Sequence, residues 1–142
     1  MSDYHICLEE NPRKEDVDAL GEILREYNRE FTEEPGSQPL AILLRASDGR
    51  LMGGLRGATR WGYLCIDWLA IRSEARRGGY GTRLLAAAEQ EARTRGCRYA
   101  RLDTFSFQAL PFYQKLGYDV VGVIDDFPPG HRQYYLRKTL AG

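Results

Sequence analysis

A basic, glycine-rich run at residues 76–82 is the strongest chemical signal in this sequence. It reads Arg76, Arg77, Gly78, Gly79, Tyr80, Gly81 and Thr82. The run lies between an apolar stretch and an amphipathic one, so a strand and a helix should direct free backbone N–H groups to one point. Glycines let a phosphate approach the backbone, and arginines add bidentate donors. The pattern indicates a pyrophosphate site, with an unliganded Gly-rich turn as the competing interpretation.

Two widespread phosphate-binding motifs do not match this run. A Walker A loop requires Gly-Lys-Ser/Thr, which is absent. A dinucleotide-binding fingerprint forced onto Gly79 and Gly81 would place Leu84 where a third small residue belongs. Coenzyme A, which carries a pyrophosphate and an additional ribose phosphate, remains as the ligand class that fits.

Two motifs at a matching separation resemble those of the GNAT superfamily of acetyltransferases. Arg76-x-x-Gly79-x-Gly81 is similar to the family's coenzyme A loop, R/Q-x-x-G-x-G/A. Residues 109–118 are similar to its second motif, A-x-x-F-Y-x-x-x-G-F/Y, and residues 67–71 to the apolar strand before the loop. The resemblance covers roughly residues 40–138. Within it, the later Pro-Pro-Gly-His is similar to a bacterial subgroup whose amine acceptors are largely unassigned.

This resemblance implies a site for acetyl coenzyme A and no metal. Backbone groups of residues 69–71 would pair with the pantetheine arm, and one N–H would polarise the thioester carbonyl. Ser106 stands where the family often has Asn, which leaves its contact with the arm open. The implied cofactor-binding residues are Leu69, Ala70, Ile71, Arg76, Arg77, Gly78, Gly79, Tyr80, Gly81, Thr82, Ser106 and Phe112.

Tyr113 aligns with the tyrosine that acts as general acid in this family. A phenol, whose ordinary pKa is about 10, stays protonated at neutral pH and can donate a proton to a thiolate. Asp67 is the predicted general base, because partial desolvation in its apolar strand would raise the pKa of the carboxyl. Asp103, His131 and a chain of water molecules are the alternatives.

The resemblance places the acceptor amine at the N-terminal helices and the late loop. The implied substrate-binding residues are Tyr27, Phe31, Asp103 and His131. Residues 1–40 carry 11 acidic and 4 basic side chains, whereas residues 41–101 carry 12 basic and 5 acidic ones. The acidic segment would attract a cationic amine, and part of the basic excess belongs to the pyrophosphate loop. We therefore expect a small cationic primary amine that attacks directly in a ternary complex.

Six or seven strands and about four helices are expected to position these residues. Apolar alternation and turn signals predict strands at residues 4–8, 40–45, 51–60, 63–71, 99–104, 120–124 and 133–138. Helical spacing predicts one or two helices over residues 12–31, another at 82–95, and a short one at 106–116 that Ser106 would cap. The order βααββ–βαβαββ predicts an α/β (α+β) fold, with a GNAT-like mixed, mostly antiparallel sheet in a single domain of residues 1–142.

Composition restricts the compartment and the partners. The 142 residues carry 20 basic and 20 acidic side chains, so no global charge favours nucleic acid or a membrane surface. No apolar run approaches the roughly 20 residues of a transmembrane helix, and no signal peptide is recognisable. Three cysteines far apart in sequence fit neither a disulfide framework nor a zinc site, which favours the cytoplasm. A homodimer formed through the strand at residues 134–136 is a further expectation.

Two other classes of function compete with an enzyme. One is a coenzyme A-binding regulatory or interaction module without turnover, and the other is a nucleotide-binding regulator that uses the Arg-rich loop. Thiol release with a panel of amines would separate the enzyme from the module. A higher affinity for NAD or ATP than for coenzyme A would identify the regulator.

Overall fold

The computed structural model describes residues 3–140, and the chain divides into two compact units, Met1–Glu34 and Pro35–Gly142. The N-terminal unit contains one helix, α1 (Lys14–Asn28), which has an apolar face. The side chains on this face are Val17, Leu20, Ile23, Leu24 and Tyr27. Their helical spacing is what the sequence predicted. A single domain over residues 1–142 stays a prediction.

Two expectations for the N-terminal unit are wrong. Of the one or two helices expected over residues 12–31, one is present, but it begins at Lys14 rather than at residue 12, with Arg13 as its extended N-cap residue. Residues 4–8 form no strand. A strand needs a hydrogen-bonding partner, and residues 3–34 contain no other strand. The apolar alternation of residues 4–8 is therefore not sufficient by itself to form a strand.

Basic side chains of the N-terminal unit neutralise part of its acidic excess. Arg29 forms ion pairs with Glu22 at 3.1 Å and with Glu34 at 2.6 Å. Hydrogen bonds from Arg25 and Arg29 lower the pKa of Glu22. These pairs are exposed to solvent, so each adds little stability. They leave the segment with a net negative charge.

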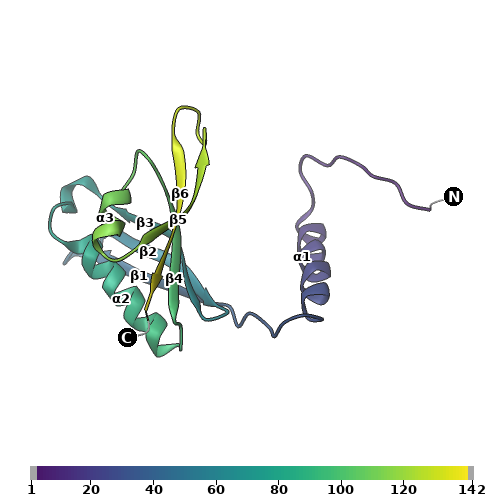
Figure 1. The fold of residues 1–142 in the computed structure, drawn as a ribbon, viewed down its shortest axis with the longest axis horizontal. Coiled ribbons are helices and arrows are strands. Elements are labelled where there is room, and N and C mark those ends of the chain that lie inside the picture. The colour runs from purple at the N-terminus through teal and green to yellow at the C-terminus, as the bar shows by residue number, and fades with distance from the viewer. Residues whose placement is uncertain (1–2, 141–142) are drawn as a thin grey trace. The chain divides into compact units, whose positions relative to one another are not determined.

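Six strands form one sheet in the second unit (Figure 1). They are β1 (Gln38–Arg45), β2 (Leu51–Arg60), β3 (Tyr63–Ile71), β4 (Tyr99–Phe105), β5 (Asp119–Asp125) and β6 (Arg132–Thr139). Their spatial order is β1-β2-β3-β4-β6-β5, and the β3–β4 pair is the parallel one. The predicted mixed, mostly antiparallel α/β sheet is confirmed, with three α-helices among the described residues instead of about four.

Two helices of this unit lie on the same side of the sheet (Figure 1). Helix α2 (Tyr80–Thr94) follows a 3-10 turn, η1 (Ser73–Ala75), and α3 (Leu110–Lys115) follows β4. One face of α2 and the ring of Tyr113 on α3 share an apolar core with β2, β3, β4 and β6. Burial of this apolar surface fixes both helices against the sheet.

Strands β3 and β4 pair only at their first residues. The parallel register ends where Cys65 meets Arg101, and the strands separate beyond it. The β2–β3 register also shifts, since Gly57 pairs with Ile66 whereas the preceding residue of β2 pairs with Trp68. A Cβ at Gly57 would collide with the backbone carbonyl of Cys65, so this close approach requires glycine. The shift is a β-bulge that leaves Asp67 outside the regular pairing.

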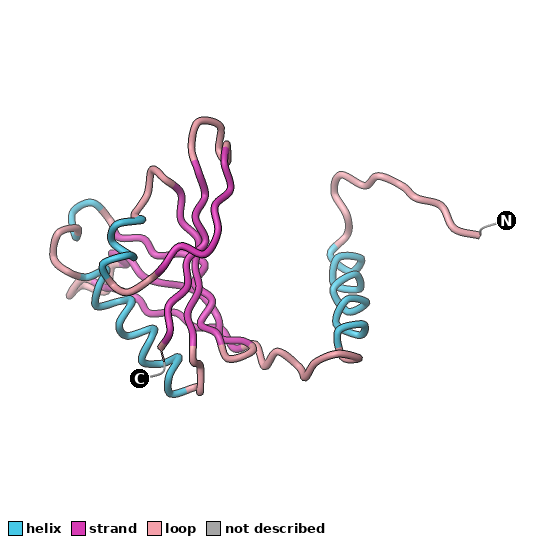
Figure 2. The backbone as a smooth tube through the Cα atoms, in the orientation of Figure 1, coloured by secondary structure: helices cyan, strands magenta, loops and turns pink. Residues whose placement is uncertain are grey.

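Strand β6 lies inside the sheet, with β4 on one side and β5 on the other. Both of its edges are therefore hydrogen-bonded within the sheet, and the homodimer expected through residues 134–136 stays a prediction. The edge strands are β1 and β5, and the β5–β6 hairpin extends beyond the other strands (Figure 2). None of the helices within residues 3–140 is long and apolar enough to cross a membrane.

Candidate active site

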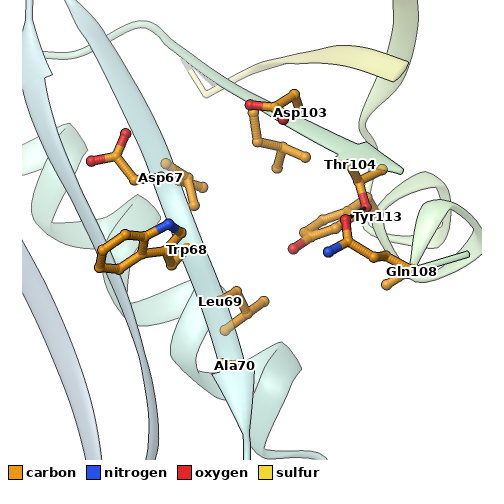
Figure 3. Close-up of a pocket in the computed structure, with 11 residues that line it drawn as sticks. Asp67, Trp68, Leu69, Ala70, Asp103, Thr104, Gln108 and Tyr113 are labelled. Carbon is orange, nitrogen blue, oxygen red and sulfur yellow. Dashed lines mark hydrogen bonds between the residues drawn. The ribbon is translucent and has the colours of Figure 1, made fainter. Parts of the chain in front are cut away.

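The space where β3 and β4 separate is a pocket of about 330 Å³, which we call the strand pocket (Figure 3). Side chains of β3, β4 and α3 surround it, and two of them are carboxylates, Asp67 and Asp103. The complete lining is Ile66, Asp67, Trp68, Leu69, Ala70, Leu102, Asp103, Thr104, Gln108, Ala109 and Tyr113. The pocket exists because the bulge and the short β3–β4 register keep the two strands apart.

A second pocket of about 650 Å³, the loop pocket, continues toward the glycine-rich loop. It is lined by Leu69, Ala70, Ile71, Arg76, Gly81, Phe107, Gln108, Ala109, Phe112 and Tyr113. Five of these residues also line the strand pocket, and Tyr113 is one of them. The two pockets therefore adjoin at Tyr113, between the end of β3 and α3.

The Tyr113 side chain is only 7% exposed. Its ring packs edge-to-face against Phe112 and Tyr118, with centroid distances of 5.1 and 6.0 Å. Figure 3 shows its hydroxyl group pointing toward β3. Burial raises the pKa of the Tyr113 phenol, and the negative charge of Asp103 raises it further. This side chain therefore stays protonated at neutral pH and can donate a proton into the pocket.

The predicted anion loop has the geometry of a helix N-terminus preceded by left-handed residues. Gly79 is the N-cap of α2 with φ 76°, and Arg77 has φ 68°. The helix begins at residue 80 rather than 82, which brings the N–H groups of Tyr80 and its neighbours into the first turn. Consecutive N–H groups in such a conformation form a concave site for anions.

Arg76 and Gly81 connect this loop to the loop pocket. The Arg76 Nε–H group donates a 3.0 Å hydrogen bond to the carbonyl of Ile71, so the arginine is held at the end of β3. A Cβ at Gly81 would lie 3.2 Å from the ring of Phe112, a tight contact that favours glycine. These contacts bring the loop, β3 and α3 to one place and fit a ligand that carries a pyrophosphate at one end.

The sequence predicted that Asp67 is partly desolvated, and this expectation is wrong. Its side chain is 52% exposed and forms an ion pair with Arg56, with 3.6 Å between Oδ2 and the guanidinium. The same guanidinium lies 5.2 Å from the centre of the Trp68 ring. The bulge takes Asp67 out of the regular β2–β3 pairing, and its carboxylate stays accessible to solvent. Its role as a base stays a prediction.

Asp103 is held by a chain of hydrogen bonds from β6. The Gln133 amide Nε2 donates to Asp103 Oδ2 at 2.9 Å, and the Tyr135 hydroxyl donates to Gln133 Oε1 at 3.0 Å. The Gln133 side chain is only 7% exposed. The antiparallel register places Asp103 directly opposite Tyr135, so the sheet itself brings these groups together.

Ser106 and His131 contact each other but line neither pocket. Ser106 Oγ accepts a 3.1 Å hydrogen bond from the Arg132 N–H group and lies 3.2 Å from His131 Nδ1. The prediction that Ser106 caps the short helix is wrong, because α3 begins four residues later with Ala109 as N-cap. The His131 ring contacts Phe107, a lining residue of the loop pocket, at 4.9 Å between centroids.

Several predicted residues are not connected to the pockets by the structure. Tyr27 and Phe31 belong to the N-terminal unit, where their rings are 5.2 Å apart. Arg77, Gly78, Gly79, Tyr80 and Thr82 lie in or next to the turn that starts α2 but do not line the loop pocket. Their roles in binding stay predictions.

The structure adds pocket residues that sequence reasoning missed. Trp68 and Gln108 line the strand pocket, and Gln133 fixes one of its carboxylates. Gln108 Oε1 accepts hydrogen bonds from the Phe105 N–H group and the Thr104 hydroxyl, and its amide nitrogen points into the pocket (Figure 3). Trp68 follows Asp67 and Gln108 precedes the second motif, so their positions in the sequence could have identified them as pocket residues. The position of Gln133 depends on the β4–β6 register, for which the sequence has no local signal.

Comparisons with known proteins agree on one family. The sequence model of the acetyltransferase (GNAT) family matches residues 4–118. A blasticidin-S acetyltransferase of Streptomyces morookaense is 43% identical over 65% of this chain and 68% of its own length. Acetyltransferase Atu2258 of Agrobacterium fabrum is 34% identical over 84% of this chain and 88% of its own length. The crystal structure of an acetyltransferase from Bacillus cereus superimposes with a TM-score of 0.86 at 32% identity, covering 96% of this chain and 97% of that one.

Proposed function

The chain belongs to the GNAT family of acetyltransferases, and we propose that it transfers the acetyl group of acetyl coenzyme A directly to a primary amine. One observation carries this proposal. Tyr113, a buried phenol, lies where a pocket with carboxylates adjoins a pocket that leads to the basic, glycine-rich loop. An acid at this junction can reach a thioester in one pocket while an amine enters from the other.

The loop pocket and the start of α2 would hold acetyl coenzyme A. The turn at Gly79, with Arg76 beside it, suits the pyrophosphate. Beyond Cys65, β3 has no strand partner on its β4 side, so backbone groups of residues 69–71 are available for the pantetheine arm. A backbone N–H group there would polarise the thioester carbonyl in the manner of an oxyanion hole.

Each residue would serve one step of the transfer. The amine nitrogen bonds to the carbonyl carbon, the carbon–sulfur bond breaks, and Tyr113 donates its proton to the departing sulfur. The amine must first lose a proton, which Asp67 would accept and pass to solvent, because its side chain is half-exposed. As the amide forms, the nitrogen loses a second proton, which restores the tyrosinate through solvent, so that one turnover of a protonated amine releases one proton in total.

A small, cationic amine is the proposed acceptor. The lining of the strand pocket contains Asp67 and Asp103 but no lysine or arginine. A relative named for acetylation of blasticidin S supports a small-molecule acceptor.

Thiol release from acetyl coenzyme A in the presence of a panel of primary amines tests the proposal. The panel should include cationic, neutral and anionic amines of similar size, and direct binding of coenzyme A should be measured in parallel. We expect amine-dependent thiol release that is fastest with cationic amines. Binding of coenzyme A without thiol release on every amine would instead identify a coenzyme A-binding module.

A further inference from the structure

The two carboxylates of the strand pocket differ in their surroundings. Asp67 already has a cationic partner, since Arg56 lies 3.6 Å away. Asp103 takes part in no ion pair among residues 3–140, although it lines the same pocket. Figure 3 shows the two side chains on opposite sides of the opening, with the hydroxyl of Tyr113 between the strands. A cation entering the pocket therefore meets one carboxylate whose charge is not yet compensated.

Hydrogen bonds hold the Asp103 carboxyl group in place as an acceptor. The Tyr135 hydroxyl donates to Gln133 Oε1, so the Gln133 amide must present its Nε2–H group to Asp103. The Gln133 side chain is nine-tenths buried, which removes competition from water and limits its rotation. One oxygen of the carboxylate is held in this way, and Oδ1 is left to face an incoming donor. The sheet thus orients a charge that its own residues do not neutralise.

The reaction excludes the attacking amine as the lasting partner of Asp103. An amine attacks only after it has lost its proton, and a neutral amine would leave the charge of Asp103 uncompensated. The attacking nitrogen must be neutral, while the charge of Asp103 needs a cation. A second group on the acceptor that stays cationic throughout the transfer allows both. Such a group would also reduce the influence of Asp103 on Tyr113, because that influence is electrostatic. The acid would then release its proton more readily when the acceptor is bound.

We propose that Asp103, oriented by Gln133 and Tyr135, binds a second, non-reacting cationic group of the acceptor. The preferred acceptor is therefore a diamine or an amine that carries a guanidinium group. Asp103 contacts the substrate, whereas Gln133 and Tyr135 are positioning residues that act through it. The inference rests on the proposed acetyl transfer and adds to it the number of charges on the acceptor.

Comparison of 1,4-diaminobutane with butylamine tests the inference, because the two differ by one cationic group at equal chain length. The wild-type enzyme should use the diamine at least fivefold more efficiently in kcat/KM, beyond the factor of two due to its two equivalent amines. This preference should decrease as salt is raised, since salt screens the attraction. Diamines of two to six carbons should show an optimum, which reports the spacing between the two bound groups.

Variants separate the anchor from its supports. Asp103→Asn should raise KM for the diamine about fivefold and leave KM for butylamine unchanged. Tyr135→Phe should produce a smaller change with the same pattern, because the Gln133 amide can then rotate. Asp119→Asn is the matched control, since Asp119 is an exposed strand residue that lines neither pocket.

The possible outcomes distinguish the two proposals. Two results would overturn this inference and leave the acetyl transfer intact. One is an equal kcat/KM of the wild-type enzyme for both amines, and the other is an equal rise in KM for both amines in Asp103→Asn. Absence of thiol release with every amine would overturn the proposed function and the inference with it. The comparison of amines with the wild-type protein decides the matter even if a variant fails to fold.

Discussion

Replacement of Tyr113 by phenylalanine removes one hydroxyl group and leaves the rest of the junction between the pockets in place. The ring would keep its packing against Phe112 and Tyr118. No hydrogen bond within residues 3–140 depends on the lost hydroxyl group, so the melting temperature should change by less than about 2 °C. Any large effect on turnover therefore reports chemistry and not packing.

The expected loss follows from the role of the phenol. A positioned general acid contributes about 100-fold to 10,000-fold to a rate, or about 3–5 kcal/mol of activation free energy. Tyr113→Phe should lower kcat by this factor, whereas KM for acetyl coenzyme A should stay nearly constant because Arg76 and Gly81 are untouched. Thiol release under saturating amine measures kcat, and titration with coenzyme A measures binding.

The pH profile provides an independent check of Tyr113. Its pKa is raised by burial and by Asp103, so the acid form persists above pH 10 and the enzyme should not lose its acid between pH 6 and 9.

Tyr63→Phe is the matched control for Tyr113→Phe, since Tyr63 pairs with Tyr99 at the far end of the sheet. A kcat for Tyr113→Phe within threefold of the wild type would refute the assignment of Tyr113 as general acid.

Three further predictions test the loop, the bulge and the buried network. Arg76→Ala should raise KM for acetyl coenzyme A about tenfold with little change in kcat, because the proposed charge-assisted contact with the pyrophosphate is lost; Arg101→Ala, outside both pockets, should leave the steady-state rates unchanged. Gly57→Ala should lower the free energy of unfolding in urea by about 1–3 kcal/mol, since its Cβ meets backbone; an unchanged midpoint would contradict the close approach. Tyr118→Phe should cost about 1.5–3 kcal/mol, because the Tyr118 hydroxyl donates to the buried Glu89 carboxylate at 2.8 Å. The pKa of Tyr118 is raised by folding, so wild-type stability should fall as pH rises above about 10, and less steeply in this variant.

Local sequence patterns were sufficient to predict most of the strands and to identify the family. Six of the seven predicted strands are found within two residues of their expected bounds, because apolar alternation and turn residues act over a few neighbouring positions. The two motifs around Gly81 and Tyr113 identified the family, which the comparisons confirm. The seventh strand, residues 4–8, shows the limit of such patterns, because a strand also depends on a distant partner.

Residues close together in the chain were enough to predict the six strands of the sheet, the glycine-rich loop and the phenol of Tyr113. The surroundings of each acidic side chain depend instead on how distant segments pack. Asp67 meets Arg56 because a bulge shifts the β2–β3 register, and Asp103 meets Gln133, 30 residues later, because β4 pairs with β6. Strand register and the separation of β3 from β4 are properties of the whole sheet. They therefore set which carboxylate is already paired and which is left for a ligand.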